Sequence, residues 1–193
     1  MRQTVTLEHA NRLINHGPTV LVSSAHGGRR NVMAAAWSMP VEFTPPRVAV
    51  VIDKSTFSRE LVLASGTFAL NLPCRAIADL TYTVGSVSGR EEGADKFERY
   101  AIDSFDGPVL GLPLVAWCVA WLECRVIREP HAEEAYDTFF AEVVSASADD
   151  RVFAQGRWSF RDDNTALHTL HHLGGGTFAL PAATVKAEVL EGR

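Results

Sequence analysis

Three polar residues, Lys54, Ser55 and Thr56, stand between an apolar run that ends at Ile52 and a helical pattern that begins near Phe57. The free N–H groups and the partial positive charge of a helix N-terminus attract anions, and Lys54 adds a full charge. The segment therefore predicts a phosphate site. Helix capping by Ser55 or Thr56 is the commoner role of such residues, so the signal is weak by itself.

A second chemical feature is the tract NVMAAAWS, which begins at Asn31 and ends at Ser38. Alanine has weak strand propensity and little side chain to bury, and a strand that gives up packing volume often lies against something else. We expect a flat aromatic ligand to rest on this tract. As a strand it would place Asn31, Met33, Ala35 and Trp37 on one face and Ala34, Ala36 and Ser38 on the other. A buried helical turn is the alternative interpretation, because an alanine run favours helix.

Other polar residues are weaker candidates. Asn71 is the polar exception in TFALNL, where it either presents an amide to a ligand or ends a strand before Pro73. Ser88, Arg90 and Lys96 belong to a Gly/Ser loop and the charged segment behind it. Such a loop is usually a flexible connection, but these side chains could also grip an anion.

Three histidines, His168, His171 and His172, lie near the end of the sequence. We expect a short helix capped by Asn164 and ending at Gly174, which would place the imidazoles on one face, as helical metal ligands are placed. Against a metal, no acidic residue or cysteine accompanies them locally, and imidazoles suit a helix C-terminus electrostatically. We predict no metal site.

The elements that must position these residues are mostly strands. Apolar alternation and turn signals predict strands over 19–23, 67–72, 114–128 and 137–147, and two more within 31–52. Helices are expected after Thr6, from about 57 to 66, and around 77–84. Many strands with few long helices indicate a mainly β fold, an antiparallel barrel with peripheral helices.

The composition is that of an ordinary globular chain. A length of 193 residues with 47% hydrophobic and 21% charged residues suits one domain with one core, spanning residues 1–193. A net charge of −5 argues against a broad nucleic-acid surface and favours a small-molecule site. No signal peptide or membrane-spanning run is evident, and the three cysteines form no CxxC pair, so cytoplasmic residence is expected.

Taken in order, several stretches resemble the flavin reductase-like family of FMN-binding split-barrel proteins, and within it the flavoredoxin-type branch. They are PTVLVSS, NVMAAAWSMPVEFTPPRVAVVID, KSTFSRELV, SGTFALNLP, GSVSGREEGADKF and the strand bearing LECRV. The resemblance covers roughly residues 15 to 150. No single motif is diagnostic, and the succession of motifs carries the match.

The resemblance implies a six-stranded antiparallel Greek-key split β-barrel that forms a homodimer, with FMN bound noncovalently beside the subunit interface. It also implies that residues 31–38 line the flavin, that the turn at Lys54, Ser55 and Thr56 receives the phosphate or ribityl chain, and that Asn71 lies nearby. Further phosphate-side contacts implied in the same way are Ser88, Arg90 and Lys96. The C-terminal LHHLGGGTFA brings His171 or His172 near the cofactor.

The function implied is that of an FMN flavoprotein oxidoreductase, which moves electrons from a reduced donor such as NAD(P)H to flavin or a downstream acceptor. Many relatives carry a histidine where this sequence has Tyr136. That departure favours, to a small degree, an FMN electron carrier without its own NAD(P)H turnover. A metal-dependent enzyme built on the C-terminal histidines is a remote alternative, and no catalytic acid or base stands out.

Overall fold

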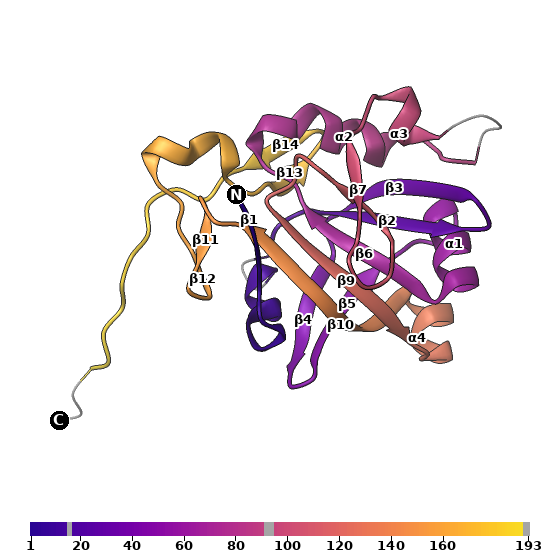
Figure 1. Ribbon diagram of the computed structural model, residues 1–193, viewed down its shortest axis with the longest axis horizontal. Coiled ribbons are helices and arrows are strands. Elements are labelled where there is room, and N and C mark those ends of the chain that lie inside the picture. The colour runs from indigo at the N-terminus through magenta and orange to yellow at the C-terminus, as the bar shows by residue number, and fades with distance from the viewer. Residues whose placement is uncertain (15–16, 91–94, 191–193) are drawn as a thin grey trace.

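An antiparallel sheet forms the centre of the fold in the computed structural model, which describes residues 1–14, 17–90 and 95–190 (Figure 1). Its strands follow the order β3-β2-β6-β9-β10-β5-β4, and β1 pairs with β10. The bounds are β1 (Arg2–Thr4), β2 (Val20–His26), β3 (Arg29–Ala35), β4 (Ser38–Phe43), β5 (Pro46–Val51), β6 (Thr67–Leu72), β9 (Ala120–Ile127) and β10 (Thr138–Asp149).

The predicted mainly β class with peripheral helices is confirmed, but the sheet has eight strands where six were expected. One extra strand arises within 31–52, because the chain leaves the sheet at Ala36 and Trp37 and returns as β4 before the turn into β5. Another is β1, which is too short to show an alternating pattern. The strand expected over 114–128 is interrupted, and its first part is the separate β8 (Pro113–Val115).

The core runs between the sheet and its covering helices. Phe68, Phe139 and Leu122 are fully buried there, and Cys118 and Cys124 are core residues as predicted. The opposite face of β9 is also covered, because the carboxylate of Glu123 accepts hydrogen bonds from the backbone N–H groups of Val109 and Leu110 at 3.0 and 2.7 Å. The sheet is therefore packed on both sides at its centre.

Helix α1 (Phe57–Ser65) begins and ends as predicted. The Thr56 hydroxyl accepts a hydrogen bond from the N–H of Arg59, and Gly66 ends the helix in the left-handed conformation at φ +69°. Both α1 and α2 (Ala78–Ser86) lie against β3 (Figure 1). The remaining helices are short: η1 (Leu7–Leu13), η2 (Arg75–Ile77), α3 (Lys96–Arg99), α4 (Pro130–Ala135) and η3 (Asp162–Leu167). No described helix has the length and apolar character needed to span a bilayer.

The helix expected from Asn164 to Gly174 is wrong. Only η3 forms, and the chain then makes the hairpin β13 (His171–Gly174) and β14 (Thr177–Ala179). Three consecutive glycines, 174 to 176, make the turn with φ values of +109°, +55° and +79°, which side-chain-bearing residues rarely adopt. Two further hairpins pair β7 (Ser104–Asp106) with β8, and β11 (Phe153–Ala154) with β12 (Arg157–Trp158).

Asn71 ties three strands together. Its side chain is fully buried, and the amide nitrogen donates to the Leu21 carbonyl and the Ser23 hydroxyl, each at 3.0 Å. The amide oxygen accepts from the N–H of Val115 at 2.8 Å. The amide is thus engaged by β2 and β8, so the prediction that Asn71 contacts a cofactor is not supported by its position.

Replacing Asn71 by alanine should lower the free energy of unfolding by about 3 kcal/mol, because buried backbone and hydroxyl groups lose their partners. Urea unfolding followed by circular dichroism measures the change. The matched control is Thr83→Ala, which removes an exposed hydroxyl from α2 and should change stability by only about 0.5 kcal/mol. An equal loss in both variants would contradict a structural role for the Asn71 amide.

Candidate functional site

Two adjoining cavities lie beside β3 and α2: one also borders the β13–β14 hairpin, and the other borders the start of α1. The apolar cavity, about 270 Å³, is lined by Thr19, Ala34, Ala36, Thr81, Tyr82, Gly85, Ser86, His172 and Phe178. The polar cavity, about 220 Å³, is lined by Asn31, Met33, Ser55, Thr56, Phe57, Val84, Gly85, Ser86, Val87, Ser88, Gly89 and Lys96. Gly85 and Ser86 line both, so the two cavities meet at the last turn of α2.

Residues with a small side chain or none, from strand β3 and helix α2, form one wall of the apolar cavity. Ala34 and Ala36 line it from the β3 strand and its end, whereas Ala35 is buried in the core. A Cβ atom added at Gly85 would lie 3.0 Å from the Cβ atom of Ala34, tighter than ordinary packing. The close approach of α2 to β3 therefore depends on small residues on both elements.

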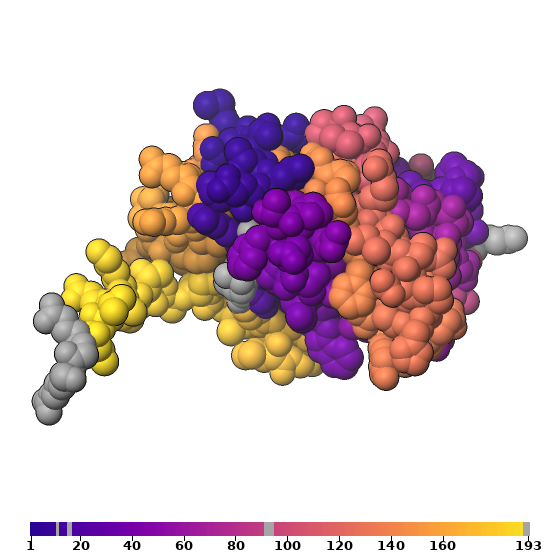
Figure 2. Space-filling model, turned by 90° about the horizontal axis from the view of Figure 1, so that it is seen from below, coloured from indigo at the N-terminus to yellow at the C-terminus, as the bar shows by residue number. Residues whose placement is uncertain are grey.

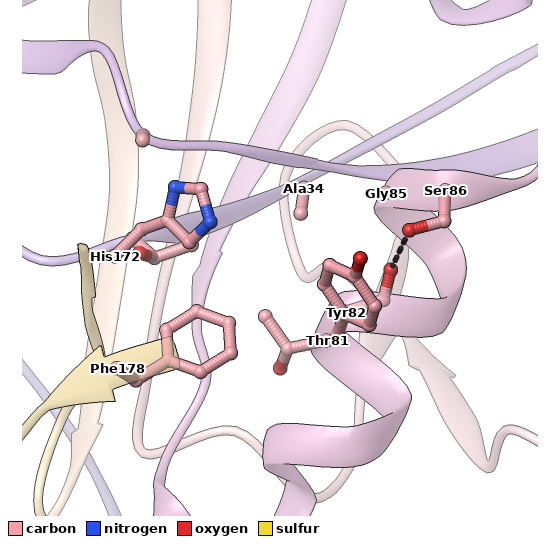
Figure 3. A pocket seen from close by; sticks show the side chains of 9 residues that line it. Ala34, Thr81, Tyr82, Gly85, Ser86, His172 and Phe178 are labelled. Atoms are coloured by element: carbon pink, nitrogen blue, oxygen red, sulfur yellow. Dashed lines mark hydrogen bonds between the residues drawn. The ribbon is translucent and has the colours of Figure 1, made fainter. Parts of the chain in front are cut away.

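Aromatic side chains form the rest of the apolar cavity, and Figure 3 shows how they surround it. Tyr82 projects from α2, while His172 and Phe178 are cross-strand partners in the C-terminal hairpin with ring centroids 5.4 Å apart. The hairpin also rests on Tyr82, because a Cβ atom added at Gly176 would lie 3.2 Å from that ring. The result is a mainly apolar cavity, which we call the apolar slot, with alanine and glycine on one wall and aromatic side chains on another.

The polar cavity contains two buried polar side chains. The Asn31 amide nitrogen donates to the Ser58 hydroxyl at 2.9 Å, but its oxygen has no hydrogen-bond partner within the described part of the chain. The Lys96 ammonium donates to the carbonyl oxygens of Val32 and Val84 at 2.9 and 2.8 Å. Burial lowers the pKa of Lys96 to about 8. This cavity therefore offers one uncommitted acceptor and one buried cation.

Ser55 and Thr56 form the side of the polar cavity at the start of α1. The Ser55 hydroxyl donates to the Asp53 carboxylate at 2.5 Å, and the Thr56 hydroxyl donates to the Asp53 carbonyl at 2.8 Å. The capping interpretation of Thr56 is confirmed. Both residues also line the cavity, so capping and ligand contact are compatible. Ser88 joins them from the loop after α2.

The structure brings only part of the predicted site together. Seven of the predicted residues line the two cavities: Asn31, Ala34, Ala36, Ser55, Thr56, Ser88 and Lys96. The other seven line neither cavity: Ala35, Trp37, Ser38, Lys54, Asn71, Arg90 and His171. Strand geometry explains part of this division, because successive residues point to opposite faces and only alternate alanines reach the cavity.

Two of the cations predicted beside the phosphate, Lys54 and Arg90, are bound by other groups of the protein. Lys54 donates to the carbonyl of Glu134 and lies 3.8 Å from the Asp137 carboxylate. Arg90 pairs with Glu60 at 2.7 Å and donates to the Thr56 carbonyl at 3.3 Å, which places it near the polar cavity without lining it. Lys96 is therefore the cation that lines either cavity among the described residues.

The C-terminal histidines do not act as a set. The His168 ring is buried, with its nitrogens within hydrogen-bond distance of the Pro181 and Arg161 carbonyl oxygens at 2.9 and 3.0 Å. His171 and His172 are in β13, so the expected shared helix face is wrong, and His172 lines the apolar cavity where His171 does not. In the described ranges, no three His, Cys, Asp or Glu side chains could hold a metal ion.

Sequence reasoning missed Thr19, Tyr82 and Phe178. Tyr82 lies in the predicted helix around 77–84. It forms part of the cavity wall together with the β13–β14 hairpin, which the sequence pattern did not reveal. The three glycines before Thr177 were the available signal for that hairpin. A larger hollow of about 720 Å³ lies elsewhere, beside Trp117 and Trp121, and none of the predicted site residues lines it.

The model of the family described as "Flavin reductase like domain" matches residues 12–170. A relative from Escherichia coli K12, YddH, is 57% identical over 95% of this chain and 96% of its own. The crystal structure of an FMN-binding domain of a flavin reductases-like enzyme from Shewanella baltica is 41% identical, with a TM-score of 0.94 over 97% of this chain and 98% of that chain.

Flavoredoxin of Desulfovibrio vulgaris (Miyazaki F) is more distant, at 21% identity with a TM-score of 0.75 over 89% of this chain and 90% of that chain. At this identity the likeness shows the fold alone, and it agrees with the predicted split-barrel architecture. The succession of motifs, the fold and the match over residues 12–170 lead to one conclusion: the chain belongs to the flavin reductase-like family.

Proposed function

We propose that the chain binds FMN noncovalently in the two adjoining cavities and works as an FMN flavoprotein oxidoreductase, which takes electrons from NAD(P)H and passes them to flavin or a downstream acceptor. The observation that carries this proposal is the pairing of a side-chain-poor apolar slot with a polar cavity that holds an uncommitted amide oxygen and a buried cation. One ligand with a flat ring and an anionic tail satisfies both.

The apolar cavity fits the ring of the flavin. Ala34, Ala36 and Gly85 leave a wall without bulky side chains, and Tyr82 and Phe178 provide aromatic surface that favours a planar guest. The Thr19 hydroxyl is buried in the same cavity, and it has no hydrogen-bond partner in the described chain. It is suited to bond a polar edge of the ring, since a buried unpaired hydroxyl is costly.

The polar cavity fits the ribityl chain and the phosphate. The Asn31 amide oxygen can accept a hydrogen bond from a ribityl hydroxyl, and the Ser55 and Ser88 hydroxyls lie on the same surface. The Lys96 ammonium already donates two hydrogen bonds to carbonyl oxygens, which leaves one N–H and a positive charge for an anion. Asn31 and Lys96 would thus hold the tail, and the last turn of α2 would lie beside the point where the tail joins the ring.

The chain's own residues bind, orient and exclude water. FMN, when bound, supplies the hydride and electron chemistry, so no strong acid or base is required of the protein. Phe178 and Tyr82 shield the apolar slot, and His172 brings an imidazole to the same wall, where a ring nitrogen can donate or accept a hydrogen bond. The hairpin therefore controls which molecules reach the slot.

We further propose a homodimer with the cofactor beside the interface. Alternate residues from the end of β3 along β4 expose large apolar side chains, with Trp37 74%, Met39 57% and Phe43 70% exposed, and Val41 between them. We call Trp37, Met39, Val41 and Phe43 the β4 stripe. An exposed apolar surface of this kind marks an interaction site. The stripe begins next to Ala36, so a second copy would border the apolar cavity.

We also propose that the protein resides in the cytoplasm.

A second candidate is an FMN electron carrier that NAD(P)H does not reduce. It shares the cofactor site but needs no nicotinamide pocket. The observation that favours it is Tyr136, which stands where the family resemblance implies a histidine and lies 66% exposed after α4, outside both cavities.

Ala36→Val should weaken FMN binding roughly tenfold, about 1.4 kcal/mol, because two added methyl groups enter the slot intended for the ring. Titration of flavin-free protein with FMN, followed by quenching of flavin fluorescence, measures the dissociation constant. Ala166→Val is the matched control, since Ala166 is an exposed alanine of η3 outside both cavities. If wild-type protein takes up no FMN, the proposed cofactor is wrong.

The affinity for FMN should fall as the pH rises from 7 to 9.5, because Lys96, with a pKa near 8, loses its charge over this range. Loss of one charged hydrogen bond weakens binding by roughly tenfold. Bound phosphate stabilises the protonated amine and moves the midpoint upward. In Lys96→Met this part of the pH dependence should vanish. An identical pH profile in the two proteins would place the phosphate away from Lys96.

Anaerobic mixing of the FMN-loaded protein with NADH or NADPH should bleach the absorption of oxidised flavin stoichiometrically, because a reductase accepts electrons from the nicotinamide directly. A stopped-flow spectrometer records the decay at 450 nm, with dithionite as the control for complete reduction. Bleaching by dithionite or a reduced protein donor, but by neither nicotinamide, would favour the carrier.

A further inference from the structure

Residues 181–190, which we call the C-terminal arm, extend from the body without forming a helix or strand. Its apolar side chains are almost completely exposed: Val185 by 91%, Val189 by 96% and Leu190 by 91%. In Figures 1 and 2 the yellow arm stands clear of the rest of the molecule. Three large apolar side chains held in water are unfavourable compared with the same side chains packed on a surface.

The base of the arm is firmly attached beside the apolar cavity. The carbonyl oxygen of Pro181 lies 2.9 Å from Nδ1 of the buried His168 ring. Just before it, β14 contributes Phe178 to the cavity wall. The arm therefore follows directly after the hairpin that lines the cavity.

The β4 stripe is the complementary surface. It presents apolar side chains at every second position, and its members remain exposed, so the arm of the same chain does not cover them. The arm has the same period: an extended chain places Val185, Ala187 and Val189 on one side. Ten extended residues span roughly 33 Å, which is enough to reach a neighbouring subunit.

The match to the Shewanella baltica structure covers 97% of this chain, which leaves out about six of its 193 residues. The arm is longer than that. Terminal segments are usually poorly ordered unless something ties them down.

We propose that the C-terminal arm of one copy docks on the β4 stripe of a second copy, so that the homodimer is held by exchanged arms. The exchange ties the β13–β14 hairpin of each cofactor cavity to the partner subunit. The inference rests on the homodimer of the proposed function but not on the identity of the cofactor.

Cysteine crosslinking tests the docking directly, because all three native cysteines are buried and the introduced thiols are exposed. Tagged Val189→Cys protein is mixed with untagged Phe43→Cys protein, allowed to exchange subunits, and oxidised mildly. We expect a disulfide-linked pair of one tagged and one untagged chain. Val109→Cys, an exposed apolar position outside the stripe, replaces Phe43→Cys as the matched control. Equal yields with the two partners would overturn the proposal.

Truncation after Pro181 supplies an independent measurement. The truncated chain and Phe43→Glu should each weaken dimerisation at least tenfold by sedimentation, and the combined variant should be no weaker than either alone, because both changes remove one contact. Additive losses would show that the arm and the stripe do not meet. If the crosslink forms in protein that binds no FMN, the cofactor proposal fails while the arm exchange stands.

Discussion

The close approach of α2 to β3 is the constraint on which the candidate site depends. A Cβ atom added at Gly85 would lie only 3.0 Å from that of Ala34, so the distance between the two elements depends on glycine at this position. Lys96 strengthens the approach, because one ammonium group bonds the carbonyl oxygen of Val32 in β3 and that of Val84 in α2. With larger side chains the helix would move outward, and the two cavities beside its last turn would lose their shape.

Some of this arrangement was readable from sequence because its causes are local. Thr56 and Gly66 mark the ends of α1 through hydrogen bonds within one turn, and the strand that follows has a simple apolar pattern. Two alanines of the tract, Ala34 and Ala36, line the apolar cavity. The break after Ala35 was not predicted, since the chain leaves β3 for β4 under the influence of pairing with β5, which is not encoded in the tract itself.

Where the structure departs from what the sequence led us to expect, the causes are non-local or ambiguous. Asn71 stood out as a candidate ligand-binding residue because its hydrogen-bond partners, Leu21, Ser23 and Val115, are distant in sequence. His168, His171 and His172 have helical spacing, but the glycines that follow favour a hairpin, and spacing alone cannot decide between the two. Arg90 and Lys54 carry the right charge for a phosphate, yet acidic and carbonyl groups of neighbouring elements engage them first.

The last turn of α2 borders both cavities and so sets the distance between them. Gly85 and Ser86 line both cavities, so a molecule that occupies both must reach from the aromatic side chains past this turn to the Lys96 ammonium. A rigid spacer of this kind discriminates by length: a molecule engages both ends only when its ring and its charge are the right distance apart. A flat compound without a tail would occupy the apolar cavity alone. A tailed compound without a ring would occupy the polar cavity alone, so each would make only part of the contacts.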